Sequence, residues 1–242
     1  MDISQPTIDL VVERLVARYS PDANVIGLFL IGSAATRTMD QRSDIDLIVV
    51  TKEPTPHSRE EFTDESGLPV EVLLNTGDEL NSYIKEEDGS LYRNVSTMLA
   101  DAKIIYDPTD ALADFLISAT KTLASKTTLS EEDRLMHRYS LADFLSDAER
   151  EDEAGNMLAA ALVAELLIRN AIEAILALSG SYYLPPRRLV ARLRELDPEF
   201  TDKLGAYHAA TAAQRLEALT DLTGVALARL GGPLPASWTL PK

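Results

Sequence analysis

Two aspartates stand two residues apart at the start of an apolar run, in the segment Ser43-Asp44-Ile45-Asp46-Leu47. Side chains alternate between the two faces of a β-strand, so Asp44 and Asp46 should project from one face with their carboxylates close together. Two like charges at such a spacing raise the pKa of at least one carboxyl unless a cation lies between them. The pair therefore predicts a metal-ion site, with an acidic edge-strand pair that serves only solubility as the alternative.

Gly32 and Ser33 directly follow the apolar run from 25 to 31, which predicts a buried strand. A glycine-serine turn at this place can present backbone amides and a hydroxyl to phosphate oxygens, particularly where Ser33 opens a short helix. Taken alone, such a pair is more often an ordinary turn. Its meaning depends on the aspartates that follow it.

The combined pattern is Gly-Ser, nine intervening residues, then Ser-Asp-x-Asp-Leu. This string resembles the signature of polymerase-beta-like nucleotidyltransferases, a family that includes the antibiotic and the minimal nucleotidyltransferases. The resemblance implies that Gly32 and Ser33 hold a nucleoside triphosphate and that the two aspartates hold two Mg²⁺ ions. The nucleotide-binding set that it implies also includes Ser43, Asp44 and Asp46.

The resemblance also implies a third metal-binding carboxylate on a neighbouring strand. Glu71 stands at the centre of the apolar run from 70 to 74, where this carboxylate is expected, and an ordinary edge-strand glutamate is the alternative. Many relatives carry a small basic segment with glycine after Gly-Ser, whereas this chain has Ala34-Ala35-Thr36-Arg37. The departure leaves Arg37 as the candidate phosphate contact.

Three carboxylates of this kind suit nucleotidyl transfer. Attack of a hydroxyl on an α-phosphate gains from charge neutralisation and in-line positioning, which two metal ions can provide. Magnesium is a hard ion that prefers oxygen ligands. We therefore expect a magnesium-dependent enzyme that moves a nucleoside monophosphate, with AMP from ATP as the first choice, onto a hydroxyl group.

Strands and helices that could position these residues follow from the apolar pattern. An amphipathic helix is expected at about 7–19, and strands are expected at 25–31, 44–50, 70–74 and 103–106. The capping-box pattern Thr76-x-x-Glu79 predicts a helix start after the third strand. After the break at Asp107-Pro108 the periodicity is helical, with helices expected at about 109–125, 130–151, 155–179, 186–196 and 209–230.

These elements predict an α+β protein with two domains. A mixed β-sheet flanked by helices should form a nucleotidyltransferase catalytic domain at 1–108, and an all-α bundle should form an acceptor-binding domain at 109–242. The last residues, from Gly231 to Lys242, predict an irregular tail.

The helical half resembles, without a specific motif, the acceptor-binding domain of aminoglycoside and lincosamide nucleotidyltransferases. Those relatives often use an acid from this domain to take the proton of the acceptor hydroxyl. Asp143 and Asp147 lie four residues apart on one helix face, with Arg150 three residues further on, so either aspartate is a candidate catalytic base. A solvated helix face is the alternative, and Glu86 and Glu87 are rival bases.

Two further segments of the helical half carry residue types that could serve a function. The segment from 181 to 188 combines two tyrosines, two prolines and two arginines, which predicts a structural corner, with ligand binding by Tyr183 or Arg187 as the alternative. Helical ribonuclease domains that accompany some minimal nucleotidyltransferases carry Arg, four residues, then His. Here Arg169 is followed at that spacing by Ala174, so ribonuclease activity is not expected.

The charge balance of the 242 residues is strongly acidic, with 39 acidic against 23 basic side chains and a net charge of -16. Nucleic-acid binding draws much of its affinity from Lys and Arg, so this balance argues against long DNA or RNA and favours a small cationic acceptor. Solubility is the alternative reason for the acid. No stretch approaches the roughly 20 apolar residues needed to span a bilayer.

The N-terminal sequence Met1-Asp2-Ile3-Ser4 lacks the features of a secretory signal, and the chain has no cysteine, so a cytoplasmic protein is expected. The leading hypothesis is a transferase that modifies an aminoglycoside or lincosamide and thereby gives antibiotic resistance. The alternatives are an antitoxin-like protein adenylyltransferase and a catalytically silent nucleotide-sensing module. The sequence leaves open the acceptor, the nucleotide base and the choice between monomer and homodimer.

Overall fold

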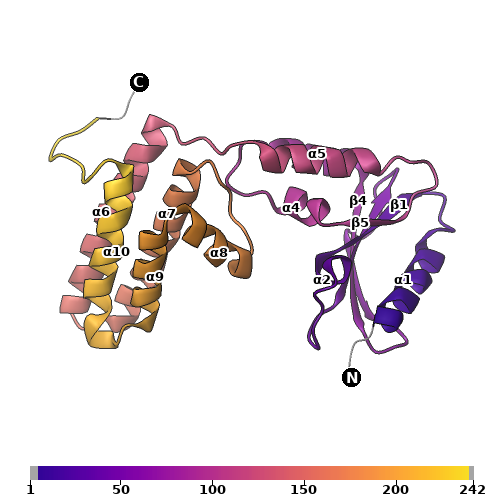
Figure 1. Cartoon of the computed structure of the whole chain (residues 1–242), viewed down its shortest axis with the longest axis horizontal. Helices are drawn as coiled ribbons and strands as arrows, with labels where there is room; N and C mark the ends of the chain where they lie inside the picture. The colour runs from indigo at the N-terminus through magenta and orange to yellow at the C-terminus, as the bar shows by residue number, and fades with distance from the viewer. Residues whose placement is uncertain (1–4, 240–242) are drawn as a thin grey trace. The chain divides into compact units, whose positions relative to one another are not determined.

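The computed structural model describes residues 5–239 (Figure 1). The N-terminal sequence at 1–4 and the end of the tail at 240–242 lie outside the described residues. The chain forms two compact units. We call them the sheet unit, which comprises the chain up to Asp88 and Arg93–Ser125, and the helical unit, which comprises Gly89–Tyr92 and the chain from Lys126 onward.

The sheet unit is built on a five-stranded mixed sheet in the order β3-β4-β2-β1-β5. β2 and β4 are parallel, and the other neighbouring pairs are antiparallel. Branched apolar residues dominate the two central strands because both of their faces are covered. The strands are β1 (Val25–Ile31), β2 (Ile45–Thr51), β3 (Arg59–Thr63), β4 (Pro69–Thr76) and β5 (Lys103–Tyr106).

Helices cover both faces of this sheet. On one face α1 (Gln5–Tyr19) contributes Val11 to the core, and on the other α3 (Gly77–Glu86) and α5 (Ala113–Ala124) contribute Leu80 and Phe115. The capping box of Thr76 and Glu79 starts α3 as the sequence predicts. Two shorter helices complete the unit, α2 (Gly32–Thr36) and α4 (Asn94–Ala100).

Alternation along β2 decides which face carries the acidic side chains. Ile45 and Leu47 lie in the core beneath α1, whereas Ile48 lies in the core on the opposite face. Asp46 stands between Ile45 and Leu47 in the sequence, so it shares the face of Ile48. The acidic face is therefore the one that α3 and α5 cover further along the strands.

The helical unit is a bundle in which α6, α7, α9 and α10 lie side by side (Figure 1). Its apolar core includes Leu141, Leu167, Phe200 and Leu222. The elements are α6 (Glu131–Glu153), α7 (Met157–Leu178), α8 (Pro186–Leu196), α9 (Pro198–Ala209), the 3₁₀ turn Ala212–Gln214 and α10 (Arg215–Leu230).

The tail after α10 is irregular, as predicted for its described part, and it is attached to α6. The Arg138 side chain donates hydrogen bonds to the carbonyls of Gly232 and Pro233 at 2.7 and 2.8 Å. The rings of Tyr139 and Trp238 are 5.6 Å apart. Within residues 5–239, none of the helices combines the length and the apolar character needed to cross a membrane.

Hydrogen bonds within each unit hold the segments where the chain passes from one unit to the other. The chain passes from the sheet unit into the helical unit at Gly89–Tyr92, returns to the sheet unit for Arg93–Ser125 and enters the helical unit again at Lys126. It therefore crosses between the units three times. Within the helical unit the Tyr183 amide donates to the Leu91 carbonyl at 2.7 Å. Within the sheet unit the buried Arg93 guanidinium donates to the carbonyls of Thr122 and Ser125 at 2.6 and 2.7 Å.

The α+β class is confirmed, and every strand that the sequence predicts is present. The elements that the sequence does not predict include β3, α4 and α9. The single helix expected at 209–230 is wrong at its start, because α9 runs to Ala209 and α10 begins only at Arg215. The compact units divide at Ser125, whereas the expected domain boundary at 108 lies inside the sheet unit, because α5 buries Phe115 and Ala119 in the core of that unit.

Candidate active site

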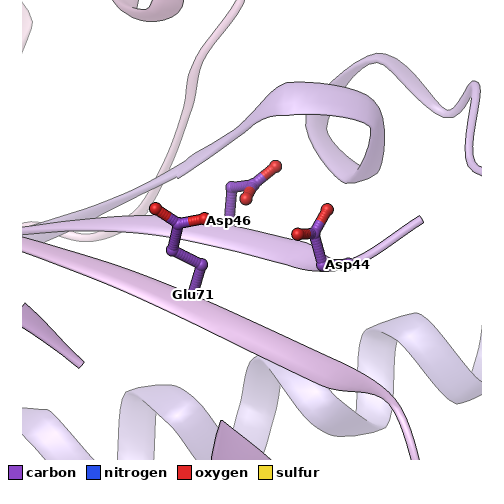
Figure 2. Close-up of side chains that lie close together, drawn as sticks. All are labelled: Asp44, Asp46 and Glu71. Carbon is purple, nitrogen blue, oxygen red and sulfur yellow. The ribbon is translucent and has the colours of Figure 1, made fainter. Parts of the chain in front are cut away.

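Three carboxylates meet on the acidic face of the sheet. Asp44 lies directly before β2, Asp46 lies on β2, and Glu71 lies on β4. In the parallel pairing of these strands Asp46 is the register partner of Glu71. One oxygen from each residue can be chosen such that the three atoms lie within 4.8 Å of one another. Figure 2 shows all three side chains on the same side of the two strands.

The electrostatics of this cluster favour a bound cation. Burial, and then the neighbouring charges of Asp44 and Glu71, raise the pKa of Asp46 from 3.8 to about 6. A carboxyl whose ionised form is disfavoured in this way gains most from a nearby positive charge. The donor set consists of carboxylate oxygens alone, which suits a hard ion such as Mg²⁺. The residues therefore fit the metal that the family resemblance implies.

Gly32 is in contact with this cluster through its backbone. It follows β1 at Ile31, the residue that pairs with Asp46 across β1 and β2, and it has a φ of +65°. A Cβ atom at Gly32 would lie 2.3 Å from the Asp46 Oδ2 atom. Only glycine permits both the left-handed backbone and this close approach. The glycine of the motif thus leaves room for the carboxylate.

Ser33, Arg37 and Ser43 differ in their surroundings. The half-buried Ser33 makes no side-chain hydrogen bond to the described residues, and Arg37 is exposed in the left-handed region at the end of α2. The Ser43 hydroxyl instead accepts a hydrogen bond from the Asp40 amide at 2.9 Å, and its own amide donates to the Asp40 carbonyl at 3.1 Å. Ser43 therefore fixes the loop that leads into Asp44.

The sequence does not predict Arg59 as part of the site. It lies on the edge strand β3, and its Nε atom is 2.9 Å from Glu71 Oε1, while its guanidinium also pairs with Glu61. The sequence carries a signal for this strand, because the turn Ser66-Gly67 lies shortly before β4 and such turns commonly join two strands. The hairpin contributes to a pocket of about 400 Å³ lined by Asp44, Arg59, Glu61, Phe62, Thr63, Pro69, Val70 and Glu71.

The candidate bases have different partners. Asp143 and Asp147 lie on α6 in the helical unit, where Asp147 forms an ion pair with Arg150 at 2.8 Å and Asp143 is exposed. Glu87 accepts hydrogen bonds from the amides of Val95 and Ser96 at 2.7 and 2.8 Å, so it caps the start of α4. Glu86 accepts one from the Ser82 hydroxyl at 2.9 Å.

The corner predicted at 181–188 connects α7 to α8 in the helical unit. The Tyr183 ring stacks on the Tyr92 ring with their centres 5.4 Å apart. The Tyr92 hydroxyl contacts Glu173 and accepts a hydrogen bond from Arg169 at 2.9 Å. This corner therefore holds the segment Gly89–Tyr92, and Arg187 is exposed.

Comparisons with known proteins agree with this geometry. Residues 8–100 match the family model of the nucleotidyltransferase domain. No curated protein sequence matches the chain. A crystal structure of a nucleotidyltransferase-like protein from Exiguobacterium sibiricum is similar over 92% of this chain and 75% of that chain, with 15% identity and a TM-score of 0.53. This likeness shows a shared fold.

A second solved structure is that of the spectinomycin adenyltransferase AAD(9) from Enterococcus faecialis with ATP and spectinomycin. The match covers 92% of this chain and 98% of that chain, with 16% identity and a TM-score of 0.37. The family match, in contrast, includes the segment that holds Asp44, Asp46 and Glu71. Residues 8–100 are therefore a nucleotidyltransferase domain, and the protein is a transferase enzyme.

Proposed function

We propose that the enzyme transfers a nucleoside monophosphate, AMP from ATP as the first choice, onto a hydroxyl group of a small molecule in a magnesium-dependent reaction. The observation that supports this most directly is the convergence of Asp44, Asp46 and Glu71 within 4.8 Å beside the Gly32-Ser33 turn. Two Mg²⁺ ions held by these carboxylates would neutralise charge on the triphosphate.

The residues around the cluster have distinct tasks in this proposal. Gly32 allows the backbone to pass close to the carboxylates, and the Ser33 hydroxyl, which has no hydrogen bond to the described residues, donates to a phosphate oxygen. The exposed guanidinium of Arg37 pairs with the phosphate charge. Ser43 acts indirectly, because its hydrogen bonds to Asp40 fix the chain just before Asp44.

The Ser33→Ala variant should raise the Michaelis constant for the nucleotide or lower turnover by about ten- to a hundredfold, since a hydrogen bond to a charged group is worth roughly 1.5 to 3 kcal/mol. Steady-state kinetics with varied nucleotide measures this effect. Ser118→Ala, which removes a half-buried hydroxyl on α5 of the same unit, is the control and should behave as the wild type. An unchanged nucleotide dependence in Ser33→Ala would mean that Ser33 serves only the turn.

Acceptor binding and proton removal are assigned to the second domain in this proposal. In this proposal the sheet unit is the catalytic domain and the helical unit is the acceptor-binding domain, so α5 belongs to the catalytic domain although it lies within 109–242. The net charge of -16 favours a cationic acceptor, such as an aminoglycoside, or a lincosamide. The acceptor hydroxyl must still lose its proton, and either Asp143 or Asp147 on α6 is proposed as the base that takes it.

Neutralising the true base should lower turnover by roughly 10² to 10⁴, the usual contribution of general base catalysis, with little change in nucleotide affinity. The loss should become smaller at higher pH as hydroxide replaces the base. Asp143→Asn and Asp147→Asn are compared with Arg150→Gln, which breaks the ion pair with Asp147 but keeps the carboxylate. Normal turnover in both aspartate variants would move the role to Glu71, Glu86 or Glu87.

The whole proposal is tested by incubating the purified full chain with ATP labelled at the α-phosphate, Mg²⁺ and a panel of aminoglycosides and lincosamides. A labelled small product that is absent with Asp46→Asn supports it. Label on a protein band would instead show a protein adenylyltransferase. Nucleotide binding without any transfer would show a nucleotide-sensing module.

A further inference from the structure

Arg59 bridges two carboxylates on one face of the sheet edge. Its Nε atom lies 2.9 Å from Glu71 Oε1, and its guanidinium also pairs with Glu61. Antiparallel register places Glu61 opposite Glu71, and parallel register places Glu71 beside Asp46. A row of three carboxylates therefore crosses β3, β4 and β2, and Arg59 binds the two at the outer end of the row.

We propose that Arg59 is an internal counter-ion that competes with the divalent cation for Glu71. This inference rests on the proposed function, which gives Glu71 to the metal. The hydrogen bond from Arg59 occupies one lone pair of Glu71 Oε1, so this oxygen is a weaker ligand for a cation while Arg59 is bound. The guanidinium also places a positive charge next to the cluster that the cation must enter, and like charges repel.

The strength of the Arg59–Glu71 pair suits a competitor that can be displaced. The Arg59 side chain is 55% exposed and the Glu71 side chain 27% exposed. Ion pairs with this much solvent contact contribute little to stability, because water screens the charges. A divalent cation carries twice the charge and can contact three carboxylates at once, so it should displace Arg59 from Glu71.

Glu61 remains an ion-pair partner for Arg59 after a cation has bound Glu71. Both residues line the pocket of about 400 Å³ that Asp44 and Glu71 also line. Arg59 can keep its contact with Glu61 while its bond to Glu71 is broken, because the two carboxylates bind different nitrogens of the guanidinium. Displacement therefore requires a side-chain shift and no rearrangement of β3.

Direct binding of Mn²⁺ to the full chain without nucleotide tests this competition, with free Mn²⁺ measured by electron paramagnetic resonance. Arg59→Gln should bind Mn²⁺ about two- to fivefold more tightly than the wild type, the range expected for loss of one exposed ion pair. The matched control is Arg18→Gln. Arg18 on α1 forms an ion pair at 3.1 Å with Glu60, which lies on β3 like Arg59. Glu60 is the residue next to Glu61 and therefore points to the opposite face of the strand, so this variant removes an equal charge from that face. It should leave Mn²⁺ affinity unchanged.

A double-mutant cycle shows whether the effect passes through Glu71. In a Glu71→Gln background the Arg59→Gln change should tighten Mn²⁺ binding by a smaller factor than in the wild type, because the contested carboxylate is absent and only the charge of the guanidinium still acts. Arg59→Lys, which keeps the charge but loses the Nε hydrogen bond, should give an intermediate affinity and serves if Arg59→Gln folds poorly by circular dichroism.

The outcomes separate this inference from the proposed function. If both chains bind Mn²⁺ and Arg59→Gln binds equally or more weakly, the competition is wrong, and weaker binding would mean that Arg59 orients Glu71 for the metal. If neither chain binds Mn²⁺, the metal assignment in the proposed function fails and the competition fails with it.

Discussion

The Asp46→Asn variant should lose nucleotidyl transfer by roughly a hundredfold or more, while its metal-free form becomes more stable than the wild type. Transfer falls because the cluster loses a charged metal ligand, and stabilisation of developing charge by metal is worth several kcal/mol. Stability rises because the substitution removes a half-buried charge that repels Asp44 and Glu71. Kinetic assays and urea unfolding in a chelator measure the two effects.

The gain in stability should depend on pH in a defined direction. The pKa of Asp46 is about 6 in the folded protein against 3.8 for an ordinary aspartate, so the folded state holds this proton more tightly than the unfolded chain. The stabilising contribution of the protonated carboxyl is complete below about pH 4 and is lost as the pH rises through about 6. Wild type and Asp46→Asn should therefore be similar near pH 4 and differ by roughly 1 to 2 kcal/mol near pH 7, allowing for solvent screening of the half-buried group.

An exposed carboxylate outside the cluster provides the control for this experiment. Glu65→Gln removes an exposed charge from the sheet unit and should leave both transfer and the pH dependence of unfolding unchanged. Addition of Mg²⁺ should stabilise the wild type more than Asp46→Asn, because ligands stabilise the state that binds them. Full transfer activity in Asp46→Asn would rule out the metal assignment.

The Gly32→Ala variant should also abolish transfer, and unlike Asp46→Asn it should destabilise the fold. Its Cβ atom would lie 2.3 Å from Asp46 Oδ2, so the carboxylate or the turn must shift. The backbone at φ +65° adds a strain of about 1 to 2 kcal/mol for any residue with a Cβ atom. We expect roughly a hundredfold or greater loss of turnover, since a displaced carboxylate misplaces the reacting groups.

Gly67 offers a matched control for this substitution. It has a φ of +82° in the turn before β4, and a Cβ atom built there meets nothing within 4 Å. Gly67→Ala should therefore show the backbone strain alone, with lower stability and normal transfer. Thermal unfolding and turnover of the two variants separate strain from the clash with Asp46. Equal turnover in Gly32→Ala and Gly67→Ala would show that the close approach at Gly32 has no catalytic consequence.

The sequence predicts the cluster because its signal is local. Asp46 lies on β2 and Asp44 directly before it, so their common face follows from alternation along an extended chain, and the apolar flanks of β2 identify the strand. Glu71 required the family resemblance, since nothing local tells which strand lies beside β2. The reason for a glycine at position 32 is also non-local, because the atom that excludes a side chain belongs to Asp46.

Elements with weak or charged patterns were not predicted. β3 reads Arg-Glu-Glu-Phe-Thr, and an edge strand needs few apolar residues, so Arg59 was missed together with its strand. The start of α9 carried a usable signal: Asp197 accepts a hydrogen bond from the Phe200 amide at 3.0 Å, and Pro198 occupies the first turn. The roles of Asp143 and Asp147 stay predictions, because they depend on where an acceptor binds.

The segment Gly89–Tyr92 belongs to the helical unit although the chain before and after it belongs to the sheet unit, and this limits how the gene for this protein could be recombined. A fragment that ends at Ser125 would contain Tyr92 without its partners Tyr183 and Glu173, and a fragment that starts at Lys126 would lack the ring that stacks on Tyr183. An exchange of the helical unit for that of another protein would have to include the four residues Gly89–Tyr92. Chimeras with two junction regions, one around 88–93 and one at 125–126, should therefore express better than chimeras with a single junction at 108.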